Sequence, residues 1–192
     1  MKTTIAPELM ALLKDLNVAK FPHLHGSAQD HLLGVYEILA NWGNTEEVCR
    51  GGLFHNIYGT EVFKPQAVSL TQRQAIAQVI GARAEELAFL FCVTRRVGFF
   101  DDHVDPQRAT LWDEVHKCKI VVDAATIAVL MEIEIANGIE QFSPDLQLAA
   151  ADARQLLLMS EWMCKQSAGR VSAAAHEDLS AVIDYMRGAL AA

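Results

Sequence analysis

Residues 27–42, SAQDHLLGVYEILANW, decide the fold, because they combine a helix-start signature with a long amphipathic run. Ser27 and the acidic residue three positions later, Asp30, form a capping box, in which each side chain bonds the backbone of the other residue. Apolar residues then recur at helical spacing as far as Trp42, and Gly43 ends the pattern. The stretch predicts a helix with one buried face.

Much of the remaining chain carries the same periodicity. Leucines at three- and four-residue spacing predict a helix within residues 5–20, and Thr45 followed by two glutamates predicts another that continues to about residue 58. Thr71 with Gln74 repeats the helix-start signature and opens a helical stretch that reaches residue 92, with a break at Gly81.

The second half of the chain is also expected to be helical, apart from a loop over residues 94–110. We expect a short helix over 111–120 and a longer one over 126–137. The run MEIEI at 131–135 also alternates like a strand, but a lone strand would have no partner. Two more helices are expected over 144–190, separated near residue 168. These patterns predict an all-α fold, a compact helical bundle formed as a single domain by residues 1–192.

Composition excludes several classes of function. The chain carries 16 basic and 24 acidic residues, a formal charge of −8, so a nucleic acid would be repelled. No stretch of about 18 apolar residues is free of charge, and Pro7 and Glu8 interrupt any secretion signal, so we expect neither a membrane span nor export. The four cysteines are far apart and form no zinc motif. We expect a cytoplasmic protein with reduced thiols.

Two histidines stand out by their placement. His31 is in register with the apolar face of its helix, and His55 follows Gly52 by three residues, so both imidazoles are expected to point inward. Gly34, Gly51 and Gly52 lie on the same two segments, where a helix gains nothing from glycine unless close approach is needed. The alternative is that both are core histidines, bonded to backbone or to each other.

The segments DHLLGV at 30–35 and GGLFHNIYG at 51–59 resemble the opening of an HD-domain protein. In that superfamily a helix histidine is followed about 25 residues later by a His-Asp pair, and a distant Asp closes the metal site. An uncharacterised branch of bacterial and fungal HD-like proteins has similar sequences to this chain in several segments: residues 21–26, 58–63, 80–81, 85–87, 91–92 and 134–141. The likeness covers residues 21–141 and implies an HD-like core.

The resemblance also implies a metal site, but with two departures. Asn56 stands where the pair has Asp, and Asn137 stands where the closing Asp is expected, so neither supplies negative charge to a cation. We therefore expect at most one metal ion, Fe or Zn, held by His25, His31 and His55, with a metal-free site as the alternative. Asp123 is a second candidate for the closing ligand, although Asp is also a favoured helix cap.

Other residues extend this candidate site. Tyr58, three residues after His55, is a candidate catalytic hydrogen-bond donor; Asn56, Asn137 and Arg95 are candidate substrate-binding residues. Arg95 and its neighbour could equally balance the acidic residues of the loop at 101–105. We expect an HD-like enzyme that acts on a small molecule by oxygenase, lyase or hydrolase chemistry, a two-metal phosphohydrolase being least favoured. The alternative is a metal-free binding protein without turnover, and the sequence leaves open whether the chain forms a homo-oligomer.

Overall fold

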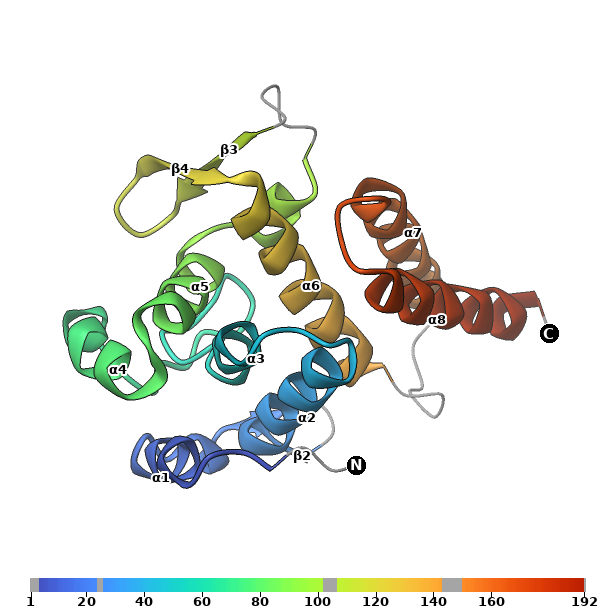
Figure 1. Cartoon of the computed structure of the whole chain (residues 1–192). Helices are drawn as coiled ribbons and strands as arrows, with labels where there is room; N and C mark the ends of the chain where they lie inside the picture. Colours follow the sequence, from blue (N-terminus) through green and yellow to red (C-terminus); the bar gives the residue numbers. More distant parts are fainter. Residues whose placement is uncertain (1–3, 24–25, 102–106, 143–149, 192) are drawn as a thin grey trace.

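The computed structural model describes residues 4–23, 26–101, 107–142 and 150–191, and these are largely helical (Figure 1). Its α-helices are α1 (Pro7–Asp15), α2 (Ala28–Asn41), α3 (Glu46–Leu53), α4 (Arg73–Ile80), α5 (Ala82–Val93), α6 (Ala124–Gln141), α7 (Ala150–Ser167) and α8 (Ala173–Ala191). Short 3-10 turns lie at Val18–Lys20, Leu70–Gln72 and Arg96–Phe99. The expectation of a mainly helical chain is confirmed.

The fold is not purely α, because it contains two antiparallel hairpins. The larger one pairs β3 (Arg108–Asp113) with β4 (Cys118–Asp123), in the register Arg108↔Asp123 to Asp113↔Cys118. The smaller one pairs β1 (Pro22–His23) with β2 (Gly26–Ser27). The prediction of a short helix over 111–120 was therefore wrong. The segment 94–110, predicted to be a loop, contains the third 3-10 turn and the start of β3. In β3 side chains alternate between buried and exposed, the period of a strand.

The helix boundaries follow local chemistry. The capping box at the start of α2 is present, with Ser27 accepting from the Asp30 backbone N–H and Asp30 accepting from Ser27. Thr45 occupies the cap position of α3, but its side chain makes no capping hydrogen bond. The capping box expected at Thr71 lies instead at Ser69, where it begins the 3-10 turn Leu70–Gln72 that precedes α4. Gly81, with φ of 96°, separates α4 from α5.

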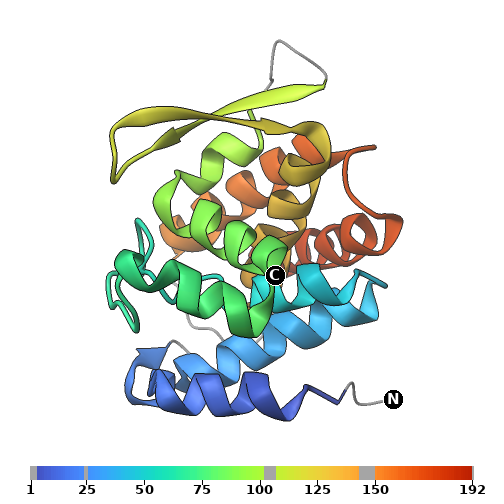
Figure 2. The same ribbon diagram turned by 60° about the vertical axis from the view of Figure 1, so that its left-hand side comes forward.

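Helices α2, α3, α5 and α6 pack around a core that runs from α1 to α8. Figures 1 and 2 place the β3–β4 hairpin at one end of the molecule and α1 at the other, with α7 and α8 beside α6. At Gly52, an added Cβ would come within 2.2 Å of the Leu39 side chain, so α2 and α3 approach closely only because this residue is glycine. The close approach expected from the glycines is confirmed there.

Two observations bear on the setting of the chain. None of the helices in the described residues is long and apolar enough to cross a membrane. The four cysteines are free thiols, with Cys49 and Cys92 buried and Cys118 exposed on β4. Burial raises the pKa of Cys49 to about 11 and that of Cys92 to about 12, so both stay protonated at neutral pH.

Candidate functional site

His31 is held from its Nδ1 side. It lies on α2 with 2% of its surface exposed, and Nδ1 contacts the carboxylate of Glu140, which comes from α6. Gly34, one turn further along α2, makes room for that carboxylate, because a Cβ there would lie 2.6 Å from Cγ of Glu140. A glycine in α2 thus lets a second helix bring an acid to the imidazole.

His55 is held in the same way by a backbone group. Helix α3 ends at Leu53, so His55 lies in the turn after the helix, rather than inside a helix continuing to residue 58. Its Nδ1 donates to the carbonyl of Gly52 at 2.7 Å, and its ring packs edge-on against Phe91 at 4.9 Å between centroids. The thiol of Cys92 donates to the His55 carbonyl at 3.1 Å. These contacts fix the direction in which Nε2 points.

The two imidazoles meet through their remaining nitrogens. Nε2 of His31 lies 3.3 Å from Nε2 of His55. Since a carbonyl only accepts, Nδ1 of His55 carries a hydrogen, and an ionised Glu140 assigns the hydrogen of His31 to Nδ1 as well. Two lone pairs would then face each other, which is unfavourable unless a proton or a metal ion lies between them. Burial, and next the neighbouring His31, hold the pKa of His55 well below its usual range.

The pair lines one wall of a cavity of about 460 Å³. That volume suits a small-molecule ligand. Its other lining residues mix polar groups with a few apolar ones: Asn56, Thr60, Val62, Phe63, Phe91, Arg96, Asn137 and Gln141. Both asparagines expected at the site, Asn56 and Asn137, therefore lie in the same cavity as the histidines.

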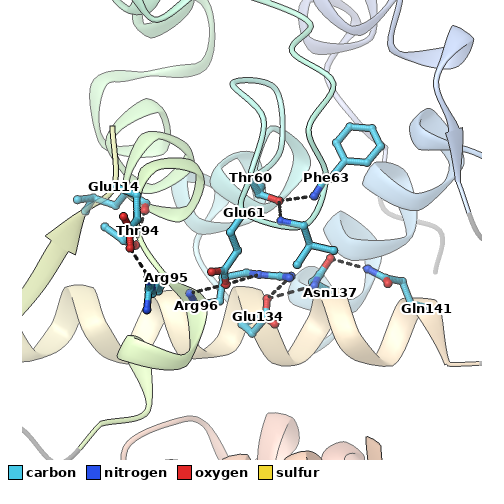
Figure 3. Close-up of polar contacts among 12 residues, drawn as sticks. Thr60, Glu61, Phe63, Thr94, Arg95, Arg96, Glu114, Glu134, Asn137 and Gln141 are labelled. Carbon is cyan, nitrogen blue, oxygen red and sulfur yellow. Dashed lines mark hydrogen bonds and ion pairs between the residues drawn. The ribbon is translucent and has the colours of Figure 1, made fainter. Parts of the chain in front are cut away.

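A row of polar side chains crosses the cavity along α6 (Figure 3). Arg96 donates to Glu134 at 3.2 Å, Asn137 donates to Glu134 at 3.1 Å, and Gln141 donates to Asn137 at 2.9 Å. Residues 134, 137 and 141 share one face of the helix by their spacing. Burial raises the pKa of Glu134 to about 7, although the guanidinium of Arg96 acts in the opposite direction. The row can hold and orient a polar ligand.

Two predicted residues lie elsewhere. The hydroxyl of Tyr58 donates to Glu85 at 2.9 Å, and Arg95 pairs with Glu114 at 2.5 Å. Both line a separate cavity of about 470 Å³, so the structure does not bring them to the histidine pair. The neighbouring Arg96 lines the histidine cavity instead. Adjacent residues of a turn point in different directions, and the sequence does not reveal which arginine faces the site.

Asp123 has the role of a cap. Its side chain accepts from the Thr126 backbone N–H at 2.7 Å at the start of α6, and Asp123 itself is exposed. It does not line the histidine cavity, whereas Asn137 does. His25, and residues 102–105 of the acidic loop, lie outside the described residues. Asp101, at the edge of that loop, is exposed.

Two important residues were not predicted. Glu140 lies in a segment that contributes to the family resemblance, and Arg96 follows the predicted site residue Arg95, but neither was itself predicted to belong to the site. The spacing of Asn137 and Glu140, three residues apart on one helix, was a signal that both could face α2. Within the described ranges, no three His, Cys, Asp or Glu side chains are grouped closely enough to hold a metal ion. Glu140 contacts Nδ1 and so acts behind His31.

Comparisons with known proteins place the histidines in a recognised segment. Residues 12–96 match the family model of a domain of unknown function, DUF6817. The matched segment contains His31, His55 and Asn56, and it ends before α6, which carries Asn137 and Glu140. No curated protein matches the chain. No solved structure matches it.

Proposed function

We propose that this chain is an HD-like enzyme that acts on a small polar molecule in the histidine cavity, with a single metal ion held by His31 and His55. The observation that carries the proposal is the 3.3 Å separation of the two Nε2 atoms, with both Nδ1 atoms already engaged. Two imidazole nitrogens that converge at this distance can both bind one cation. The resemblance to HD-domain proteins and the arrangement of these side chains favour a metal.

The residues present suit one metal ion. Two nitrogen ligands at about 2.0–2.1 Å from a tetrahedral zinc ion lie about 3.3–3.4 Å apart, close to the separation of these nitrogens. A carboxylate behind one ligating histidine and a carbonyl behind the other are the usual outer partners of such ligands. His25 remains the proposed third ligand. When bound, the ion would supply Lewis-acid chemistry to a substrate oxygen.

The rest of the chain would bind and orient the substrate. Asn56 and Asn137 offer amide donors and acceptors beside the histidines, and Arg96 offers a guanidinium that also donates to Glu134. Phe63 and Phe91 supply apolar contact on the same cavity. These groups suit a ligand that presents oxygen atoms to the histidines.

A metal-free binding protein is the second candidate. The amides of Asn56 and Asn137 supply no negative charge, which favours a neutral site. In that case a proton would lie between the two Nε2 atoms, and Glu140 would balance the charge on the imidazole pair. The ligand would then be bound without turnover.

Titration with Co²⁺ separates the two candidates. Co²⁺ commonly substitutes for Zn²⁺ and its visible absorption reports nitrogen coordination, so we expect saturation at one equivalent per chain. His31→Gln and His55→Gln should each weaken binding by about tenfold to a hundredfold or abolish it. His176→Gln, which replaces a histidine of α8 that contacts Cys164 of α7, is the matched control and should bind like the parent. Absence of a coordination spectrum in the parent protein, measured after removal of other metals, would favour the metal-free candidate.

A further inference from the structure

A second cavity lies on the other flank of α6. It has a volume of about 390 Å³ and is formed between α6, α7 and α8. Most of its lining is apolar and includes Phe142, Leu156, Met159, Met163 and Met186. Leu156 and Met159 remain 38% and 39% exposed, so apolar side chains face an open space that the described chain does not fill. Flexible methionines suit an apolar ligand of variable shape.

This apolar cavity adjoins the histidine cavity. Arg96, Asn137 and Gln141 line both, so the polar row along α6 forms the boundary between them. Figure 3 shows this row, with Asn137 and Gln141 on the helix and Arg96 reaching it from the turn after α5. A molecule lying across the boundary would meet polar groups on one side and hydrocarbon on the other.

Gly138 is a position from which the apolar cavity can be filled by substitution. It lies within α6 and lines this cavity, and an added Cβ would meet nothing within 4 Å. Gly34 and Gly52 differ, because a Cβ at either would collide with a neighbouring side chain. Gly138 is exposed, so a larger side chain there would extend into space that no described atom occupies.

A polar atom at the boundary also lacks a hydrogen-bond acceptor. Nε of Arg96 is buried and has no hydrogen-bond acceptor among the described residues. The nearest recorded carboxylate oxygen, from Glu61, is 3.8 Å away, beyond hydrogen-bond distance. A buried donor left unpaired is costly, and an acceptor oxygen on a ligand would satisfy it.

We propose that the molecule bound here is a small amphiphile, with a flexible hydrocarbon chain in the methionine-lined cavity and an oxygen-bearing head group at Arg96, facing the histidine pair. This inference rests on the proposed function for the location of the reacting head group, and it adds the substrate class. The hydrocarbon chain would pack on Gly138, and a head-group oxygen would accept from Nε of Arg96.

Decanoate is a probe of this class, and its binding can be followed by calorimetry on protein treated with chelator. We expect one molecule bound per chain. Gly138→Leu should weaken binding at least tenfold, and Gly138→Ala should weaken it less, because both side chains occupy the space of the hydrocarbon. Both variants should melt at or above the parent temperature, since each removes a helical glycine. Gly188→Leu is the matched control, because that exposed glycine of α8 also has nothing within 4 Å, and it should bind like the parent.

The head group is tested by comparing decanoate with decylamine, which has no acceptor for Arg96. We expect decylamine to bind at least tenfold more weakly, and Arg96→Met, which removes both the charge and the donor, to remove most of this difference. Equal affinity of the parent and Gly138→Leu for decanoate, or no binding to the parent, would overturn the inference. Co²⁺ uptake is read separately: uptake without decanoate binding overturns the amphiphile alone, whereas decanoate binding without uptake supports the amphiphile and removes only the metal.

Discussion

At the scale of single residues, the site depends on which atoms carry hydrogens. The Gly52 carbonyl accepts from Nδ1 of His55 and the Glu140 carboxylate contacts Nδ1 of His31, and these contacts direct both Nε2 atoms into one small volume. Neither partner could be read from the sequence. The inward direction of His31 follows from its register in α2, but its partner is Glu140 of α6, which lies 109 residues away in the sequence.

Glu134 gives the site a pH dependence. Its pKa is about 7 in the folded protein and near 4.5 when unfolded, so the folded state holds a proton that the unfolded state loses between these values. The contribution to stability is therefore complete below about pH 4.5 and is lost as the pH rises to 7. Relative to Glu134→Gln, the parent should lose on the order of 2–3 kcal/mol of unfolding free energy over this range.

Urea unfolding of both proteins at several pH values measures this difference. Glu86→Gln is the control, since that glutamate is exposed and pairs with Arg83 at the surface. The difference between the control and the parent should stay nearly constant over the same range. A constant difference for Glu134→Gln as well would show that Glu134 remains ionised beside Arg96.

At the scale of elements, helix starts were predictable where the cap is local. Ser27 with Asp30 fixes the start of α2, and Gly81 fixes the break between α4 and α5. The β3–β4 hairpin was missed because each strand has only six residues and pairs only with the other. The β-branched run Ile120, Val121 and Val122 was its signal. The argument against a lone strand concerned residues 131–135, which do lie in α6.

Asp123 separates a structural role from a functional one at the start of α6. Asp123→Ala should lower the unfolding free energy by about 0.5–2 kcal/mol, because it removes the acceptor for the Thr126 backbone N–H. It should leave Co²⁺ affinity unchanged, since the residue does not line the histidine cavity. Urea unfolding and metal titration on the same protein measure both quantities. Weaker Co²⁺ binding by Asp123→Ala, measured where this variant is fully folded, would show that Asp123 is a metal ligand.

At the scale of the whole molecule, the site forms where three distant segments meet. His31 comes from α2, His55 from the turn after α3, and Asn137 and Glu140 from α6. The placement of His31 and His55 on their segments identified both histidines, whereas both asparagines were identified by the resemblance to HD-domain proteins. It misplaced Tyr58 and Arg95, whose directions are set by Glu85 and Glu114 from other elements. Hydrophobic periodicity describes one segment at a time. Packing between segments decides which side chains share a cavity.

The metal content of protein purified without chelator tests the central claim most directly. Plasma mass spectrometry on the parent should find close to one Fe or Zn per chain, and His31→Gln and His55→Gln, purified in parallel, should hold almost none. Both variants should be checked for folding by circular dichroism. A parent protein without metal, two metals per chain, or full occupancy in either variant would contradict a single metal ion held by this histidine pair.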